Sequence, residues 1–359
     1  MNKFATILAG GGGTRFWPLS RQETPKQLLN LSGNDIMLND TIQRFEGVIP
    51  MENTVIVTNQ SQATLLESMM LSCVQHSNIL IEPVAKNTAA SILYAALFIE
   101  KCHGNSIMVV LPSDHHITDV PNFKKTLDKA CTIAIETERI VTIGIKPTFA
   151  STGYGYISYD QAPILHDPCP AFEVSEFVEK PNFKKAQNYF NSGEYLWNSG
   201  MFVWTTSVII ESFKRYLPRL YKTMLPIYDH LGTDRQNEVI TEIYPQLQNI
   251  SIDYGILERS DEVVIIPGDF GWNDIGSWDA LGSIFPPDEL GNIVKANHMG
   301  IDTINSIIYG NGRLITTIGI DGLIIADTED ALLICPKDKA QSVKDIVKML
   351  KENEMTEFI

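Results

Sequence analysis

The sequence predicts an α/β protein in which a mixed, mostly parallel sheet is followed by a small β-rich region and a last helix. Through the first 150 residues, short apolar, β-branched runs alternate with stretches of helical spacing, which is typical of a sheet with helices on both faces. From about residue 151, glycines and aromatic residues in extended segments such as "TGYGYISY" and "MFVW" indicate antiparallel insertions. After residue 285, short β runs separated by Asn, Gly and Asp turns show no helical period.

The first half predicts a Rossmann-like alternation of strands and helices. Buried strands are expected where apolar, β-branched residues follow one another, at 4–8, 55–58, 79–81, 107–111 and 140–145. Helical spacing lies between them, at 61–74, 87–101 and 122–138. Asn87 and Thr88 precede an apolar helical face, which predicts that they cap the second of these helices.

The second half is expected to add helices at 206–217 and 235–244 and a strand at 262–268. The segment "FPPD" at 285–288 marks a boundary, so we predict two domains, 1–285 and 286–359. The C-terminal β runs indicate a small solenoid-like (β-helix-like) region, with a β sandwich as the alternative. A final amphipathic helix is expected to bury one face, made of Val343, Ile346, Val347 and Leu350.

The composition narrows the classes of function. The 359 residues are 44% hydrophobic and 20% charged, which are ordinary values for a globular protein. A formal net charge of −15 argues against binding to nucleic acid or to anionic membranes. No apolar run reaches the ~18–20 residues of a membrane span and no signal peptide is recognisable, so a cytoplasmic location is expected. The five widely spaced cysteines include no C-x-x-C pair and predict reduced thiols.

The stretch "LAGGGGTRFWPLSRQETPKQ" at 8–27 places bare backbone beside the cations Arg15 and Lys26. It matches neither common glycine template: a G-x-G-x-x-G pattern that begins at Gly10 needs glycine where Arg15 stands, and no Gly-Lys-Ser/Thr of a Walker A loop follows. Glycines at the carboxyl end of a strand still offer successive N–H groups to phosphate oxygens, and Arg15 and Lys26 add positive charge. The alternative is a tight turn with two solvated cations.

Two carboxylates are candidates for a metal site. The segment "VVLPSDHH" brings Asp114 to the same sheet edge as the glycines, and "FGWNDIGSW" supplies Asp274 in a turn rich in glycine and tryptophan. Carboxylates suit Mg²⁺, which takes few protein ligands and completes its shell with phosphates. Capping of the next segment is the alternative for Asp114. His115 and His116 point to opposite faces of a strand, so we expect structural roles for both rather than a zinc site.

Two further segments carry polar groups at strand ends. The segment "FVEKP" at 177–181 offers Glu179 and Lys180 side by side before a proline ends the pairing, and "YLWNSGMF" exposes Asn198 beside the flexible Gly200. Taken alone, each has an ordinary turn or packing explanation. Their co-occurrence with the glycine stretch and the two aspartates favours one shared site.

Together these segments resemble a known family. The motifs "GGGGTRFWPLSRQETPKQ", "EPVAKNTAAS", "LPSDHHI", "TGYGYI", "FVEKP", "WNSGMF", "SIDYGILE" and "GWNDIGSW" occur in the order found in the mannose-1-phosphate guanylyltransferases of the sugar nucleotidyltransferase superfamily. The resemblance spans residues 1 to about 340. It implies a nucleotidyltransferase domain that transfers GMP from GTP to α-D-mannose 1-phosphate, giving GDP-mannose and pyrophosphate, with Mg²⁺ as cofactor.

The resemblance also implies a role for each matching residue. The metal would be held by Asp114 and Asp274. The catalytic residues would be Arg15, Lys26, Lys180 and Asp114. The sugar phosphate would be bound by Gly153, Glu179, Lys180, Asn198 and Asp253. The nucleotide would be bound by Leu8, Gly10, Gly11, Gly12, Gly13, Thr14, Arg15, Lys26, Glu82, Asn87 and Thr88. Lys86 stands where the family usually has arginine, and lysine cannot reproduce a bidentate guanidinium, so its role is left open.

Two alternatives concern the function itself. Thymidylyl or uridylyl transfer to glucose 1-phosphate fits the same spacing, because only the resemblance indicates guanine. A catalytically silent subunit that senses nucleotide sugars would be expected to lack Arg15, Lys26, Asp114 or Asp274, and all four are present. Family members are commonly dimers, so we expect a homodimer with contacts through the C-terminal region. Isomerase activity is not expected, because the chain does not continue into the cupin-like domain that some relatives carry.

Overall fold

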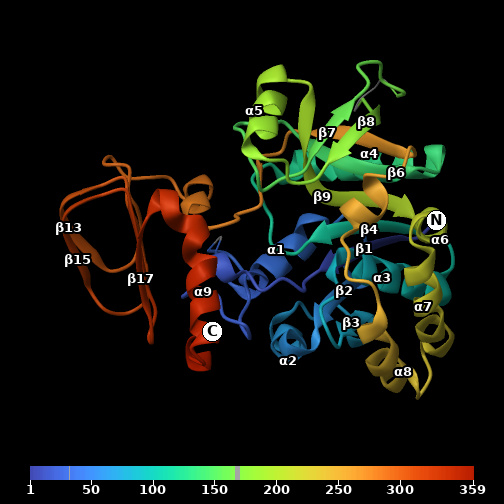
Figure 1. Cartoon of the computed structure of the whole chain (residues 1–359), viewed down its shortest axis with the longest axis horizontal. Coiled ribbons are helices and arrows are strands. Elements are labelled where there is room, and N and C mark those ends of the chain that lie inside the picture. Colours follow the sequence, from blue (N-terminus) through green and yellow to red (C-terminus); the bar gives the residue numbers. More distant parts are fainter. Residues whose placement is uncertain (32, 166–169) are drawn as a thin grey trace.

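The computed structural model describes residues 1–31, 33–165 and 170–359. A nine-stranded sheet with the strand order β3-β2-β1-β4-β9-β6-β10-β8-β7 forms the centre of the larger part of the molecule, beside the C-terminal strands (Figure 1). Strands β8 and β9 run antiparallel to the other seven. The strands are β1 (Lys3–Leu8), β2 (Thr54–Asn59), β3 (Ile79–Glu82), β4 (Ile107–Pro112), β6 (Ile140–Ile145), β7 (Tyr156–Tyr159), β8 (Phe172–Val178), β9 (Tyr195–Thr205) and β10 (Val263–Gly268).

The strands predicted in the first half are all present, each within one residue of its expected ends. They are mostly buried on both sides, as continuous apolar runs in a parallel sheet require. The expected antiparallel insertions are also confirmed. Strand β9 lies between β4 and β6 and runs antiparallel to both, and β7 pairs antiparallel with β8 and β9. The mixed, mostly parallel sheet predicted from the sequence is therefore correct.

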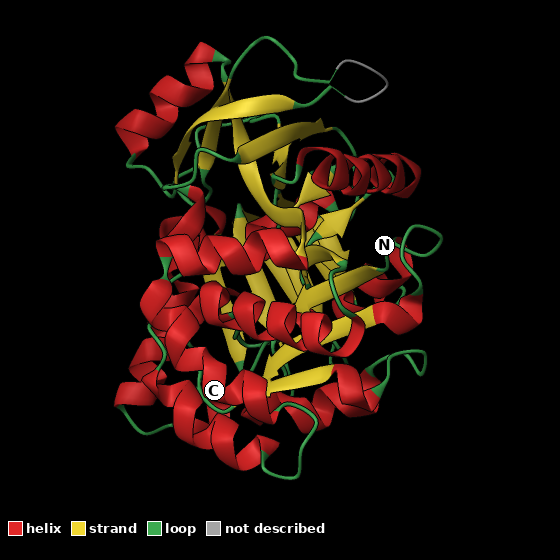
Figure 2. Cartoon of the chain, turned by 90° about the vertical axis from the view of Figure 1, so that its right-hand side faces the viewer, coloured by secondary structure: helices red, strands yellow, loops and turns green. Residues whose placement is uncertain are grey.

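Helices cover both faces of this sheet and enclose two hydrophobic cores (Figure 2). Successive residues of β1 point to opposite faces, so Phe4 enters one core while Ala5 and Ile7 enter the other. The first core is covered by α3 (Asn87–His103), α6 (Thr206–Tyr216), α7 (Pro218–His230) and α8 (Gln236–Ile243). The second is covered by α1 (Met37–Arg44), α2 (Gln60–Met69), α4 (Val120–Thr137) and α5 (Phe183–Ser192).

The C-terminal strands coil as a short β-helix. Strands β12, β14 and β16 stack in parallel in one sheet and β13 and β15 stack in parallel in another, so the chain alternates between the two sheets as it advances. This confirms the solenoid-like prediction over the sandwich. The elements are β12 (Ile293–Lys295), β13 (His298–Ile304), β14 (Ile307–Gly310), β15 (Ile315–Asp321), β16 (Leu323–Asp327), β17 (Leu332–Pro336) and α9 (Val343–Glu352).

A third core connects this β-helix to the sheet domain. Phe16 and Trp278 from the first part of the chain pack there with Ile293 and Val347. The Trp278 indole N–H also donates to the carbonyl oxygen of Trp17 at 3.0 Å. Helix α9 lies on the side of the β-helix that faces the sheet domain (Figure 1). Because this core includes residues from both sides of 285, the domain boundary at that position stays a prediction.

Some local expectations are wrong. The helix predicted at 61–74 ends at Met69, and the sequence did not predict α1, α5 or α7. Among the described residues, no side chain caps the start of α3, because Asn87 adopts a left-handed φ of 66° and its Oδ1 accepts from the next amide, that of Thr88. Ile346 is 40% exposed, since α9 buries a narrower stripe through Val343 and Val347.

Four cysteines, at 73, 102, 131 and 335, are free thiols, and Cys169 lies outside the described residues. Within the described ranges, none of the helices has the length and apolar character that a bilayer crossing requires.

Candidate active site

The carboxyl ends of β1 and β4 open onto a cleft of about 440 Å³. Strand β1 leads into the glycine stretch, β4 leads into Asp114, and Asn198 faces the cleft from β9. Ligands bind at this edge in open α/β sheets. Of the residues predicted for the site, the cleft is lined by Leu8, Gly10, Gly11, Glu82, Asn87, Thr88, Asp114, Gly153, Glu179, Asn198, Asp253 and Asp274.

A second cavity of about 310 Å³ adjoins the cleft, because Asp114, His115 and Asp274 line both. Besides these two aspartates, the predicted residues in its wall are Gly13, Thr14, Arg15 and Lys26. Gly12 faces a third hollow, on the α9 side of the loop. In the described part of the chain, Lys180 lines neither the cleft nor the second cavity. The structure thus gathers nearly all predicted site residues around two connected spaces.

The glycine loop turns its carbonyl groups towards the protein. Gln27 Nε2 donates to the carbonyl oxygen of Gly11 at 3.1 Å, and Ser20 Oγ donates to that of Gly13 at 2.7 Å. Among the described residues, the amides of Gly10 to Gly13 have no acceptor. Unpaired amides in a loop of this kind bind phosphate oxygens. The loop is therefore arranged to receive an anion through its backbone.

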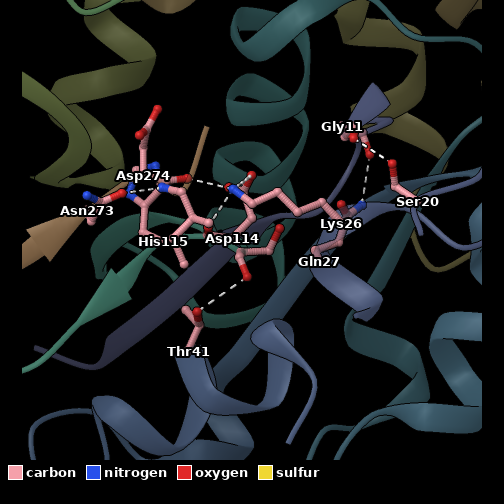
Figure 3. Close-up of polar contacts among 12 residues, drawn as sticks. Gly11, Ser20, Lys26, Gln27, Thr41, Asp114, His115, Asn273 and Asp274 are labelled. Carbon is pink, nitrogen blue, oxygen red and sulfur yellow. Dashed lines mark hydrogen bonds and ion pairs between the residues drawn. The ribbon is translucent and has the colours of Figure 1, made fainter. Parts of the chain in front are cut away.

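The ammonium group of Lys26 connects three segments of the chain (Figure 3). Its Nζ lies 2.8 Å from Asp114 Oδ2, 2.8 Å from the Asp114 carbonyl oxygen and 2.6 Å from that of Asp274. The Lys26 side chain is only 5% exposed, so these acceptors replace water around a buried charge. Gly13 lies against Lys26, and a Cβ at Gly13 would come within 2.4 Å of Lys26 Cβ.

Asp114 and Asp274 have a donor set that fits Mg²⁺. Burial acts to raise the pKa of Asp114, but the Lys26 ammonium, together with His115 and a backbone hydrogen bond, outweighs burial and holds that pKa below its ordinary value, so the carboxylate is ionised. Asp274 Oδ1 accepts a hydrogen bond from the Tyr154 hydroxyl at 2.6 Å. No cluster of three or more potential metal ligands occurs among the described residues. Two carboxylates suffice for Mg²⁺, which takes its remaining ligands from substrate phosphates and water.

His115 has the kind of structural contact that the sequence predicts. Its Nδ1 accepts from the Trp272 indole N–H at 3.0 Å, assigned from the geometry, and β5 (His116–Ile117) pairs with β11 (Trp272–Asn273). Burial lowers the pKa of His115 to about 4, so its ring is neutral at pH 7 and able to accept this bond. These contacts hold the turn that carries Asp274 over the end of β4.

Glu179 has a buried oxygen without a partner. Lys180 Nζ donates to Glu179 Oε1 at 2.7 Å, whereas no described residue bonds to Oε2. Nearby, Asn198 Nδ2 donates to Asp253 Oδ1 at 2.9 Å. Buried polar atoms are nearly always hydrogen-bonded, so an orphaned carboxylate oxygen in a cleft indicates a donor on the ligand. Gly153 lies in the same wall, but its amide already donates to Ser151 Oγ at 3.1 Å.

Neighbouring charges in this group shift the pKa values of Asp253 and Lys180. Burial, followed by the neighbouring Glu179 carboxylate, raises the pKa of Asp253 to about 6. Burial is the largest single effect on the pKa of Lys180 and acts to lower it, but the hydrogen bond to Glu179 and the nearby negative charges of Glu179 and Asp253 together outweigh burial and raise this pKa. Lys180 is therefore a cation paired with Glu179, and its side chain is 59% exposed.

Glu82, at the end of β3, supplies a second buried carboxyl group to the cleft. Ser91 Oγ donates to Glu82 Oε1 at 2.7 Å, and the Tyr244 hydroxyl donates to the same oxygen. Burial raises the pKa of Glu82, and these two hydrogen bonds offset only part of that effect. Thr88 Oγ1 accepts from the Ile252 amide at 2.9 Å, which ties the start of α3 to the segment that carries Asp253.

The residues of these spaces that were not predicted include Gln27, Tyr154, Gly155 and Lys344. Gly155 leaves room for the Glu179 carboxylate, because a Cβ at position 155 would come within 2.5 Å of Glu179 Oε2. Gln27, Tyr154 and Gly155 lie within the motifs noted above, so their position in those motifs could have identified them. Lys344 lies in α9, outside every motif, and only the packing of α9 brings it to the second cavity.

Comparisons with known proteins agree with this geometry. A family model described as nucleotidyl transferase matches residues 4–289, and a model described as a MannoseP isomerase/GMP-like beta-helix domain matches residues 296–350. The chain is 38% identical to a mannose-1-phosphate guanylyltransferase of Salmonella montevideo, over 98% of this chain and 75% of that protein. It is 35% identical to the alginate biosynthesis protein AlgA of Pseudomonas putida, over 98% of this chain and 72% of that protein.

A solved structure shares the whole fold. It is titled as a mannose-1-phosphate geranyltransferase from Thermus thermophilus, has a TM-score of 0.87 and 31% identity, and the match covers 98% of this chain and all of that one. The structure of a protein titled mannose-6-phosphate isomerase from Helicobacter pylori has a TM-score of 0.63 at 24% identity, over 76% of this chain, and shows the fold alone.

Replacing Gly13 by alanine is expected to destabilise the protein. Its φ of 57° is left-handed, which costs a non-glycine residue about 1–2 kcal/mol, and the new Cβ would collide with Lys26. Gly11→Ala is the matched control, because an added Cβ there meets nothing within 4 Å. Urea unfolding should show a loss of at least about 2 kcal/mol for Gly13→Ala and much less for Gly11→Ala. Equal losses would contradict the conformation described for the loop.

Asp253→Asn is expected to change how stability depends on pH. With a pKa of about 6 in the folded protein against an ordinary 3.8, Asp253 favours the folded state at low pH, and this contribution is lost as the pH rises through 6. Asparagine does not titrate, so the unfolding free energy of the variant should rise relative to the wild type between about pH 4 and pH 6. Urea unfolding at several pH values measures this. A difference that does not vary with pH would mean that the pKa of Asp253 is not raised.

Proposed function

The chain belongs to the nucleotidyl transferase family and, within it, to the mannose-1-phosphate guanylyltransferases, and from this premise we propose how its cleft works. The reaction joins GMP from GTP to α-D-mannose 1-phosphate and releases pyrophosphate, with GDP-mannose as the product. The observation that carries the proposal is that Arg15, Lys26, Asp114 and Asp274 line one cavity next to the cleft. Such a cavity suits a triphosphate whose α-phosphate is attacked from the cleft side.

The nucleophile in this reaction is a phosphate oxygen of the sugar phosphate. A phosphomonoester has a second pKa near 6, so this oxygen is largely ionised at pH 7 and needs no general base. The main obstacle is the repulsion between two polyanions that must meet in line. Holding the reactants in that geometry supplies about 7–11 kcal/mol of the barrier reduction, and fixed positive charge supplies much of the rest. This accounts for a site built from cations and backbone amides.

On the nucleotide side, the unpaired amides of the glycine loop bind phosphate oxygens. Arg15 adds a planar guanidinium, and Lys26 adds a buried charge at the junction of cleft and cavity. Asp114 and Asp274 would hold Mg²⁺, which neutralises charge on the triphosphate when bound. We place the guanine base beside Glu82, which lines the cleft and whose carboxyl group would accept from the N–H donors of guanine.

On the sugar side, Glu179 Oε2 is the acceptor for a mannose hydroxyl, because it is buried and unpaired among the described residues. Asn198 and Asp253 are already bonded to each other and present a joint polar wall to the sugar. Lys180 is exposed and paired with Glu179, so it is positioned to exchange that partner for the sugar phosphate. Gly153 contributes backbone in the same wall, with its amide held by Ser151.

The protein is further proposed to act as a homodimer. Its C-terminal β-helix exposes large apolar side chains, with Met299, Ile301 and Ile318 at 67%, 60% and 73% exposed. Ile301 and Ile318 are direct partners across β13 and β15, so they form one continuous apolar surface. Apolar side chains gathered in this way are common at interfaces between subunits.

Substrate choice is tested by combining several nucleoside triphosphates with several sugar 1-phosphates and measuring pyrophosphate release. GTP with mannose 1-phosphate is expected to give the highest kcat/KM, by at least about tenfold over the other pairs. A clear preference for UTP or dTTP with glucose 1-phosphate would contradict the proposed substrates.

Removal of Mg²⁺ with EDTA should reduce turnover to background. Undiminished turnover in EDTA would contradict the metal site.

A further inference from the structure

The second cavity contains a cation that comes from the C-terminal region. Lys344, in the first turn of α9, lines this cavity together with Arg15 and Lys26. Arg15 belongs to the segment just after the glycine loop, more than three hundred residues earlier in the chain. The cavity is therefore formed by both the sheet domain and the C-terminal region.

Packing of α9 fixes where Lys344 lies. The residue before it, Val343, is 2% exposed, and Val347, one turn later, is 5% exposed. Both belong to the core that also contains Phe16 and Trp17. Phe16 immediately follows Arg15, so the same contact that seats α9 brings Lys344 and Arg15 to one cavity. This placement results from a buried interface and not from a chance approach of two surface side chains.

The charges in this cavity do not cancel. Asp114 is paired with Lys26 at 2.8 Å, and Asp274 accepts a hydrogen bond from Tyr154. Neither Arg15 nor Lys344 forms an ion pair with any described residue. The whole chain carries a formal charge of −15, yet in this cavity the cations Arg15, Lys26 and Lys344 outnumber the carboxylates of Asp114 and Asp274. A polyanion is the ligand that would balance them.

We propose that Lys344 binds the pyrophosphate part of the substrate, that is, the β- and γ-phosphates of the nucleoside triphosphate before reaction and free pyrophosphate afterwards. The C-terminal region then completes the active site in addition to its role in packing. The inference rests on the proposed function for the identity of the anion, while the placement of Lys344 does not depend on it. Because Lys344 lines the second cavity and not the cleft, it does not contact the sugar.

The test compares Lys344→Ala with Lys348→Ala, in the full-length protein with Mg²⁺. Lys348 lies one turn further along α9, is exposed and pairs with Glu352, which makes it a matched control. The reverse reaction, from GDP-mannose and pyrophosphate, gives a separate KM for each substrate. Lys344→Ala should raise the KM for pyrophosphate by about tenfold, which corresponds to about 1.4 kcal/mol, and leave the KM for GDP-mannose unchanged. Lys348→Ala should change neither, and Lys344→Arg should restore most of the affinity.

Calorimetric titration of pyrophosphate into each variant provides a readout that needs no turnover. Weaker binding to Lys344→Ala alone supports the inference. Equal binding of pyrophosphate to the wild type and Lys344→Ala, with an unchanged KM, would overturn it even if the enzyme makes GDP-mannose normally. A wild type that turns over no nucleotide sugar would instead refute the proposed function, while a loss of pyrophosphate binding in Lys344→Ala would still support an anion site at this residue.

Discussion

The arrangement of the site depends on how the buried ammonium group of Lys26 is neutralised. A charge that is 5% exposed must replace its lost water with protein acceptors, and Lys26 finds them at the end of β4 and in the turn that carries Asp274. These acceptors belong to segments far apart in the chain. Because all of these acceptors bond to the one Lys26 ammonium group, Asp114 and Asp274 both lie in the wall shared by the cleft and the second cavity. Gly13 is required by the same interaction, since any side chain there would displace Lys26.

The two connected spaces divide the work of an enzyme that must bring two anions together. The cleft offers acceptors, such as Glu179 and Asp253, that suit a sugar and a base. The second cavity offers cations and lies beside the unpaired amides of the glycine loop, which suits a triphosphate. An acidic protein attracts phosphates poorly over most of its surface, so the positive groups have to be concentrated where the reaction takes place.

Much of the fold and of the candidate site was predictable from the sequence, because these parts follow from local rules. Apolar, β-branched runs identified the central strands, and the shared edge of parallel strands predicted that the glycine loop and Asp114 meet. The motif around Gln27 could have placed this residue in the site, but its hydrogen bond to the Gly11 carbonyl oxygen was not predictable, since that contact forms only in the folded chain. The unpredicted Lys344 depends on the docking of α9, and the exposed Ile346 shows that helical spacing alone does not say how wide a buried stripe is.

A double-mutant cycle on Lys26 and Asp114 tests most directly whether the pairing of the Lys26 ammonium group with Asp114 organises the site. Lys26→Met, Asp114→Asn and the double variant are compared by kcat/KM for GDP-mannose formation, after circular dichroism shows that each is folded. If the pair acts as one unit, each single change lowers the rate by about 10²–10³, and the double variant is little worse than the poorer single one. Effects that multiply in the double variant would contradict the account, because they would show that the two residues act independently.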